Sequence, residues 1–136
     1  MLQEDLHQPR RRRYILDSVA AAHATGSADL LTANPPPDPS SANFHRRDGK
    51  ALPGTAVGII STPRFALQGV LLVPDLGPES VIVSVRQLAR RGLAVTFGGE
   101  ACSVKERGTG VVVGEGRIQE EDGLYHLDFL RIPQIS

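Results

Sequence analysis

A polar pair near the N-terminus, Asp17-Ser18, carries side chains that could do chemistry. It follows the apolar run Tyr14-Ile15-Leu16, which predicts a short buried strand, and His23 comes shortly after it. A carboxylate, a hydroxyl and an imidazole are the parts of a nucleophilic triad. Adjacent residues of a strand point to opposite faces, however, so Asp17 and Ser18 cannot relay a proton together. The pattern therefore favours a structural role for His23, in a turn after Asp17-Ser18.

The remaining histidine, cysteine and glycine positions predict no metal and no cofactor. The single Cys102 excludes an internal disulfide framework and a cysteine-rich metal site. The segment Gly114-Glu115-Gly116 is not a phosphate loop, because no lysine follows it and its surroundings are typical of strands. The histidines are too widely spaced for a metal site. They stand at His7, His23, His45 and His126.

The first residues of the chain are basic. Residues 1–13 are polar and end in Arg10-Arg11-Arg12-Arg13, which predicts a flexible arm. Four arginines could contact nucleic-acid phosphates. A solvated arm, or a processing or localisation signal, is the alternative interpretation. No aromatic platform accompanies the arginines, which argues against stacking on single strands.

The rest of the sequence predicts short strands. Apolar and β-branched runs alternate with turns rich in glycine and proline, and Asp48-Gly49 supplies the turn of a hairpin over Phe44–Lys50. Residues 79–92 begin as a strand and end as a short helix, closed by basic residues and Gly92. The other predicted strands cover 14–16, 30–32, 55–61, 65–73, 93–97, 101–105, 111–113 and 124–129.

This pattern of about nine strands and one short helix predicts a mostly β fold, a small closed or partly open β-barrel. The barrel domain is expected over residues 14–130, followed by a tail over 131–136. Residues 33–43 hold four prolines, which predicts an irregular loop.

Composition sets the broad class. The chain has 136 residues, which fits one domain, and 15 basic residues balance 15 acidic ones. Nothing in the overall charge directs the protein to nucleic acid or to a membrane. No apolar run is long enough for a spanning helix, and the N-terminus lacks a signal-peptide apolar segment. We expect a protein of the cytosol or nucleus.

Four motifs together resemble the protease segment of copia-type retrotransposon polyproteins. Residues 15–26 read ILDSVAAAHATG, where that family has I-L-D-S-G-A followed by H-M-T-G. Residues 67–76 read LQGVLLVPDL, similar to L-x-x-V-L-Y-V-P-x-L, and residues 82–88 read IVSVRQL, similar to L-L-S-V-x-Q-L. A G-x-G segment and Asp122-Gly123-Leu124-Tyr125 complete the family's order. The resemblance covers roughly residues 14–129.

The resemblance implies a retropepsin-like β-barrel with an aspartic-protease site. Such a site uses two carboxylates that share one proton, so a chain with the single motif residue Asp17 must pair with a second copy. Ser18 would hold the two active-site loops together. Residues 44–60 would form the flap, with Asp48-Gly49 at its tip, closing over substrate.

One position departs from the family pattern. Val19 stands where the family has glycine, and its branched side chain would crowd substrate or the partner loop. Ala21 and Ala22 likewise replace serines. The sequence therefore favours a degenerate protease-like domain that works by binding protein, through exposed strand edges. The alternatives are an active homodimeric aspartic peptidase that cleaves a polyprotein, and a nucleic-acid accessory domain that uses the arginine arm.

Overall fold

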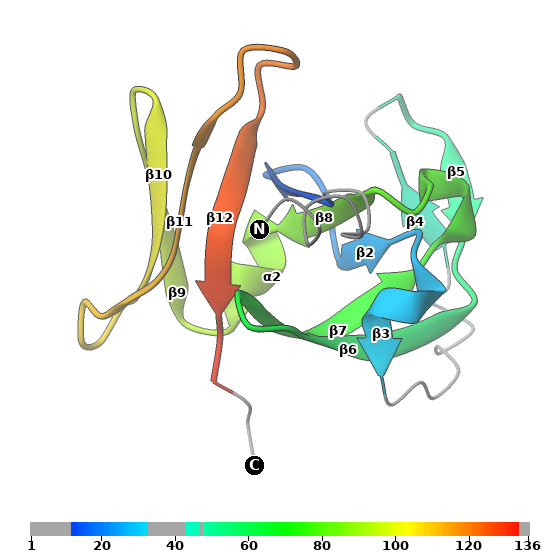
Figure 1. Cartoon of the computed structure of the whole chain (residues 1–136), viewed down its shortest axis with the longest axis horizontal. Coiled ribbons are helices and arrows are strands. Elements are labelled where there is room, and N and C mark those ends of the chain that lie inside the picture. Colours follow the sequence, from blue (N-terminus) through cyan, green and yellow to red (C-terminus); the bar gives the residue numbers. More distant parts are fainter. Residues whose placement is uncertain (1–11, 33–42, 47, 134–136) are drawn as a thin grey trace, which may run out of the picture.

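The chain folds almost entirely into strands. The computed structural model describes residues 12–32, 43–46 and 48–133 (Figure 1). The strands of this part are β1 (Arg13–Asp17), β2 (His23–Thr25), β3 (Leu31–Thr32), β4 (Asn43–His45), β5 (Ala51–Pro53), β6 (Ala56–Ser61), β7 (Phe65–Leu72), β8 (Ser80–Ser84), β9 (Leu93–Gly98), β10 (Ala101–Glu106), β11 (Val112–Ile118) and β12 (Tyr125–Arg131). The helical elements are α2 (Val85–Arg90) and two short 3₁₀ turns, η1 (Ala28–Leu30) and η3 (Pro74–Leu76).

The prediction of a mostly β fold with one short helix is confirmed. Ten strands form one sheet in the order β3-β6-β7-β2-β8-β1-β12-β11-β10-β9, and β4 with β5 forms a separate hairpin. Near its end β12 also pairs with β7, through Leu130 opposite Phe65 and Arg131 opposite Ala66. The strands β9 to β12 therefore lie on one side of the molecule, and β6, β7 and the hairpin lie on the other (Figure 1).

Parallel pairing at the centre of the sheet places Asp17 beside Ser84. Strand β1 runs parallel to β8 over its full length, from Arg13 opposite Ser80 to Asp17 opposite Ser84. The chain then turns back, and β2 pairs antiparallel with β8 while running parallel to β7. The segment between β1 and β2 is thereby held against the end of β8.

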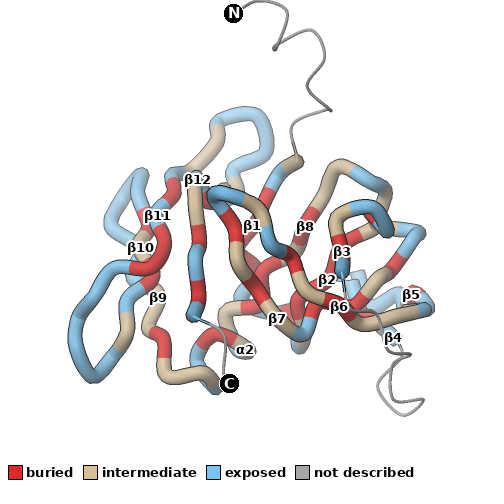
Figure 2. The backbone as a smooth tube through the Cα atoms, turned by 60° about the horizontal axis from the view of Figure 1, so that its bottom comes forward, coloured by how far each residue is buried: buried red, intermediate tan, exposed pale blue. Residues whose placement is uncertain are grey.

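Apolar side chains fill the interior on both sides of this centre. The larger cluster draws on β1, β7, β8, β10, β11, β12 and α2, and Leu88, Val83 and Leu130 are fully buried in it. Figure 2 shows the buried positions concentrated in the middle strands and the exposed ones in the connecting turns. Burial raises the pKa of Tyr14 to about 12, against a smaller opposite effect of Arg12. Tyr14 stacks on Phe65 in this core.

The observed strands are longer than the predicted ones at several ends. Arg13, expected in the arm, is the first residue of β1, and Asn43, expected in the loop, begins β4. Arg131 ends β12, and the following Ile132 is buried, so the fold continues past the expected boundary at 130. Most of the predicted arm, loop and tail lies outside the described part of the chain. The residues left out are 1–11, 33–42, 47 and 134–136.

The predicted hairpin is present between β4 and β5. Phe44 pairs with Leu52, and the N–H of Gly49 donates to the carbonyl of Arg46 at 2.9 Å. Gly49 has φ 87°, a backbone conformation that favours glycine, and the Asp48 carboxylate accepts from the N–H of Lys50 at 2.9 Å. Among the described residues, no helix has the length and apolar character needed to cross a membrane.

Candidate functional site

The Asp17 carboxylate organises the loop that follows β1. Asp17 is the last residue of that strand and is only 8% exposed. Its Oδ1 accepts hydrogen bonds from the N–H groups of Val19, at 2.8 Å, and Ala20, at 3.1 Å. Aspartate commonly closes a turn on backbone N–H groups in this way. The side chain of Asp17 thus points inward and fixes the backbone of the next three residues. We call Asp17 and these three residues the Asp17 loop (residues 17–20).

Ser84 fastens the other end of this loop. Its hydroxyl donates to the carbonyl of Ala20 at 2.7 Å and accepts from the N–H of Gln87 at 3.0 Å. Ser84 is therefore the N-cap of α2 and an anchor of the Asp17 loop at once. Ser84 has no exposed surface, and its hydrogen bond to Ala20 is buried.

His23 and Gln87 complete the anchor. The N–H of Ser84 donates to Nδ1 of His23 at 2.9 Å, and the N–H of His23 donates to Oε1 of Gln87 at 2.9 Å. The amide of Gln87 also donates to the carbonyl of Gly69 at 3.3 Å. We call His23, Ser84 and Gln87 the clasp. His23 was expected in a turn, but it is the first residue of β2, because it pairs with Val70 of β7.

Burial keeps His23 neutral. The side chain is 2% exposed, and desolvation, followed by the positive charge of Arg91, lowers its pKa from 6.5 to about 3. Nδ1 accepts a backbone hydrogen bond, so the ring proton must lie on Nε2. A protonated ring would turn this acceptor into a donor facing another donor. The clasp therefore requires the neutral imidazole.

His23 should make the fold sensitive to acid. The unfolded chain binds a proton at this histidine below about pH 6.5, whereas the folded chain binds one only below about pH 3, so stability falls as the pH drops between these values. The loss should reach about 2 kcal/mol at pH 5. His23→Asn keeps an acceptor near the Nδ1 position and removes the titration. Urea denaturation of this variant across pH 4–8 should show a flatter pH dependence than the parent protein.

The control for this experiment is His45→Asn, at an exposed histidine of β4. It should retain the parent slope. An unchanged slope in His23→Asn, or an equal flattening in both variants, would show that His23 is not the group that titrates.

The outer surface of the Asp17 loop carries one large apolar side chain, that of Val19. Ser18 and Val19 are both exposed, and Val19 is 61% exposed, the highest value among the exposed large apolar side chains. Ala20 beneath them is buried. The loop therefore folds with valine at the position where the resemblance expects glycine, and directs the isopropyl group outward.

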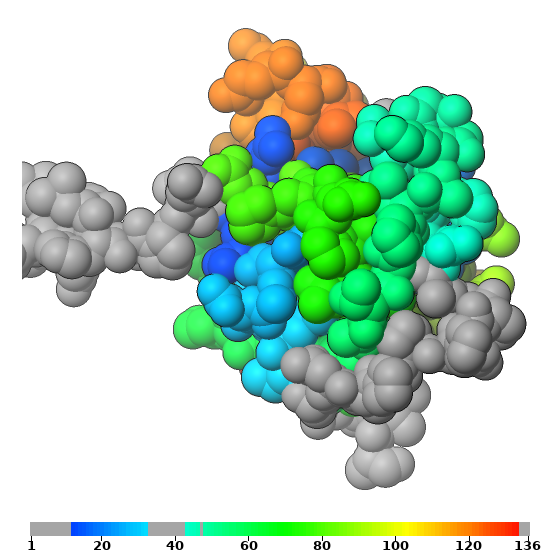
Figure 3. All heavy atoms as spheres, turned by 90° about the vertical axis from the view of Figure 1, so that its right-hand side faces the viewer, coloured from blue at the N-terminus to red at the C-terminus, as the bar shows by residue number. Residues whose placement is uncertain are grey.

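The hairpin predicted to act as a flap packs near this loop. Phe44 and Leu52 of the hairpin share a buried apolar cluster with Ala20, and the cluster continues over Val73 and Leu76 of the η3 region. Figure 3 looks onto this face, with the hairpin in teal beside the green segment that holds η3. The predicted tip residues Asp48 and Gly49 are exposed. The structure thus brings the base of the hairpin to the Asp17 loop and leaves its tip at the surface.

The arginine run is only partly described. Arg10 and Arg11 lie outside the described residues, as does His7. Arg12 donates to the hydroxyl of Ser27 at 3.0 Å, and Arg13 of β1 pairs with Ser80 of β8. These two arginines are therefore tied to the fold rather than extended from it.

No metal site is found within the described residues. They contain no group of three or more His, Cys, Asp or Glu side chains that could hold an ion. His126 instead forms a hydrogen bond with Asp122, with Nε2 and Oδ2 at 2.8 Å.

Sequence reasoning missed the anchoring roles of Ser84 and Gln87. A signal was available, because Ser84-Val85-Arg86-Gln87 has the Ser-x-x-Gln spacing of a capping box. In that motif the glutamine side chain returns to the N-cap N–H. Here the N-cap N–H goes to His23, and the Gln87 side chain is free to bond β2 and β7. The local motif is visible in sequence, but its use by distant strands is not.

Comparison with known proteins gives no match to a family model, a curated protein or a solved structure. The resemblance of residues 14–129 to copia-type polyproteins therefore rests on its four motifs.

Proposed function

We propose that this chain is a retropepsin-like domain of copia-type retrotransposon origin that now acts in the cytosol or nucleus by binding protein. Two observations support the relationship besides the motifs. The Asp17 loop is folded around its carboxylate, and the hairpin in the flap position shares a buried apolar cluster with Ala20 of that loop. Both features belong to the arrangement that the resemblance implies.

The exposed side chain of Val19 carries the functional part of the proposal. In a dimeric aspartic site the two loops must approach until their carboxylates are about 3 Å apart. Val19 lies at the surface of the loop and is 61% exposed, so it meets whatever approaches Asp17 from outside. The branched side chain holds off a second loop, and at the same time offers an apolar contact on a rigid support. Such a surface fits protein binding better than peptide hydrolysis.

The second candidate is an active homodimeric aspartic peptidase. The observation in its favour is the intact inner half of the loop, since the N–H groups of Val19 and Ala20 still bond the Asp17 carboxylate. The clasp of His23, Ser84 and Gln87 would then position a catalytic residue. The two candidates differ in what Asp17 and Val19 do, which makes them separable by substitution.

Cleavage of a proteome-derived peptide library separates the two candidates. We expect the parent protein and Asp17→Asn to give the same background at every pH between 4 and 7. Val19→Gly restores the residue that the family carries, and any cleavage that it gains should vanish in the Val19→Gly/Asp17→Asn double variant. Peptide termini are counted by mass spectrometry.

If the parent protein cleaves peptides and Asp17→Asn abolishes this cleavage, the result contradicts the binding proposal and establishes the peptidase. Urea denaturation of each variant provides the control for folding. The Asp17 substitution should weaken the loop without unfolding the chain, because asparagine keeps one acceptor oxygen for the two N–H groups.

A further inference from the structure

Strand β9 is an open edge of the ten-stranded sheet. Within the described part of the chain it ends the strand order and pairs only with β10, and the strand at the other end of the sheet, β3, has two residues. Figure 1 shows β9 and β10 at the outer side of the molecule. The sequence of β9 is LAVTFG, with no charged residue and no proline. Proteins usually protect an edge with lysine, proline or a bulge, and β9 has none of the first two.

The register shows which backbone groups of β9 face outward. Gly92 stands opposite Arg107, and the N–H of Arg107 donates to the carbonyl of Gly92 at 3.0 Å. Bonded and non-bonded pairs alternate along an antiparallel ladder. Ala94, Thr96 and Gly98 therefore bond β10, whereas the N–H and C=O groups of Val95 and Phe97 point away from it. An incoming strand could use both residues.

The two faces of this edge differ in chemistry. On the inner face Leu93 is buried, Val95 packs against the core, and Phe97 is 46% exposed with its ring edge against Tyr125. Apolar surface thus continues to the edge and stops there uncovered. On the outer face Thr96 stands opposite Ser103, and Ser103 opposite Glu115, forming a polar row across three strands.

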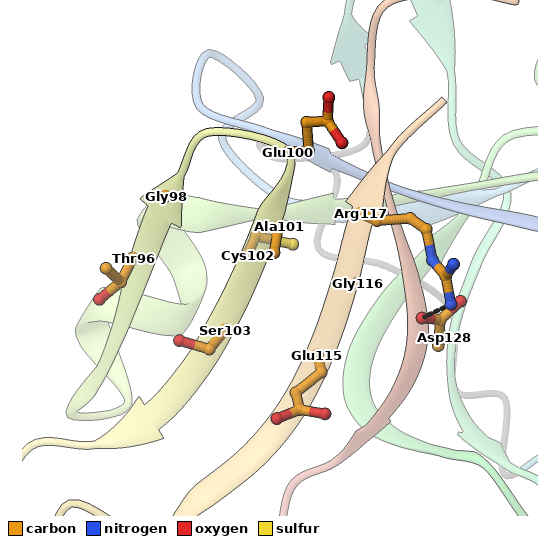
Figure 4. A pocket seen from close by; sticks show the side chains of 10 residues that line it. All are labelled: Thr96, Gly98, Glu100, Ala101, Cys102, Ser103, Glu115, Gly116, Arg117 and Asp128. Atoms are coloured by element: carbon orange, nitrogen blue, oxygen red, sulfur yellow. Dashed lines mark ion pairs between the residues drawn. The ribbon is translucent and has the colours of Figure 1, made fainter. Parts of the chain in front are cut away.

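The outer face is also hollowed and acidic. An open trough of about 590 Å³ runs over β9 to β12, and Figure 4 shows its lining side chains. Arg117 and Asp128 pair with each other at 3.5 Å. Glu100 and Glu115 have no ion-pair partner among the described residues, and both are exposed. The trough beside the open edge therefore carries uncompensated negative charge.

We propose that β9 is the edge on which a partner protein docks as an added strand, with apolar residues on one face of that strand and basic residues on the other. The apolar side chains would cover Val95 and Phe97. The basic ones would lie over Thr96 and Ser103, toward Glu115. The inference rests on the proposed protein-binding function and adds a second binding surface, with its partner chemistry, to the apolar contact at Val19.

Charge selects this occupant over a second copy of the chain. A copy that paired through its own β9 would present LAVTFG, which has no basic residue to meet Glu100 and Glu115. It would instead bring a second acidic trough to the same edge. Main-chain hydrogen bonds would supply affinity in either case, and the alternating side chains supply specificity.

The probe is an octapeptide that alternates valine with arginine, compared with the same peptide carrying glutamate for arginine. We expect the arginine peptide to shift the amide resonances of Val95 and Phe97 in ¹⁵N-HSQC titrations of the full chain. The glutamate peptide should bind at least about tenfold more weakly. Phe97→Pro removes an outward N–H without taking a bond from β10, and should weaken binding about tenfold more than Phe97→Ala, which keeps that N–H. Val111→Ala, an exposed apolar position outside β9, should leave binding unchanged.

Three results would overturn the inference. Shifts confined to residues 18–22 would remove β9 as a binding surface and leave the Asp17 loop, and the proposed function would stand. A concentration-dependent dimer that Phe97→Pro dissociates would assign the edge to a second copy. Equal affinity for the arginine and glutamate peptides, or no shift with either, would remove the basic partner, and the cleavage experiment above would still decide the function independently.

Discussion

Replacing Gly26 with alanine should destabilise the fold by about 3 kcal/mol or more, a large effect for a single methyl group. A Cβ at position 26 would lie 2.6 Å from both C and N of Gly77, and closer still to its carbonyl oxygen. Backbone atoms cannot rotate away as a side chain can. Two segments would have to separate to admit the methyl group.

The contact between Gly26 and Gly77 joins the segment after β2 to the segment before β8. Gly26 follows β2, and Gly77 closes η3 just before β8. One residue before Gly26, the carbonyl of Thr25 accepts a hydrogen bond from the N–H of Val73 at 2.8 Å. Moving the segments apart would break this bond and disturb the pairing of β2 with β8, which carries the clasp.

The measurement is urea denaturation at neutral pH, with Gly108→Ala as the matched control. A Cβ at Gly108 meets nothing within 4 Å, so this variant should stay within about 1 kcal/mol of the parent. Equal stability of the two alanine variants would show that residues 26 and 77 do not approach as described.

Ser84→Ala is the second large effect, and should cost about 2–4 kcal/mol. The hydroxyl caps α2, which is typically worth about 1 kcal/mol. Its removal also leaves the buried carbonyl of Ala20 without its donor, at a cost of about 1–3 kcal/mol. No water can replace the hydroxyl cheaply, because Ser84 has no exposed surface.

The same variant should loosen the Asp17 loop more than the rest of the molecule. Amide exchange of Val19 and Ala20 should accelerate beyond the change that global stability accounts for, because the loop loses its anchor. Ser80→Ala provides the control within the same strand, since the Ser80 hydroxyl makes only an exposed contact with Arg13 at 3.4 Å. Equal exchange at Val19 in the two variants would mean that Ser84 does not hold the loop.

Local chemistry made much of the fold predictable. The Asp48-Gly49 pair predicts its turn because glycine tolerates the positive φ, and because the Asp48 carboxylate can accept from the N–H of Lys50. Gly92 ends the helical turn, as expected of a glycine after basic residues. Wherever a neighbour along the chain decides the conformation, the sequence pattern and the structure agree.

Contacts between distant segments set the rest. The strand expected at 111–113 is longer in the structure and covers Val112–Ile118. The prediction ended too early because the apolar pattern is interrupted by Gly114, Glu115, Gly116 and Arg117. Gly116 is needed there because a Cβ would meet the backbone of His126 and Leu127 on β12. No local rule reveals that approach.

The candidate site divides in the same way. Asp17 and its neighbours could be picked from a motif of consecutive residues. The clasp could not, because it joins β2, β8 and α2 through His23, Ser84 and Gln87, whose spacing in sequence is irrelevant to their contact. Val19 was expected to crowd the site from its type alone, and only the structure shows its N–H bonded to Asp17 while its side chain faces out.

The solution mass, measured by sedimentation equilibrium from micromolar to millimolar protein, decides between protein binding and peptide hydrolysis. The protein-binding account predicts a monomer of 14.6 kDa, in which Asp17 never meets a second carboxylate. Val19→Lys, a charge on the outer surface of the Asp17 loop, should leave that mass unchanged. A dimer at twice the mass that Val19→Lys dissociates would place two Asp17 loops face to face, and would contradict the account in favour of the peptidase.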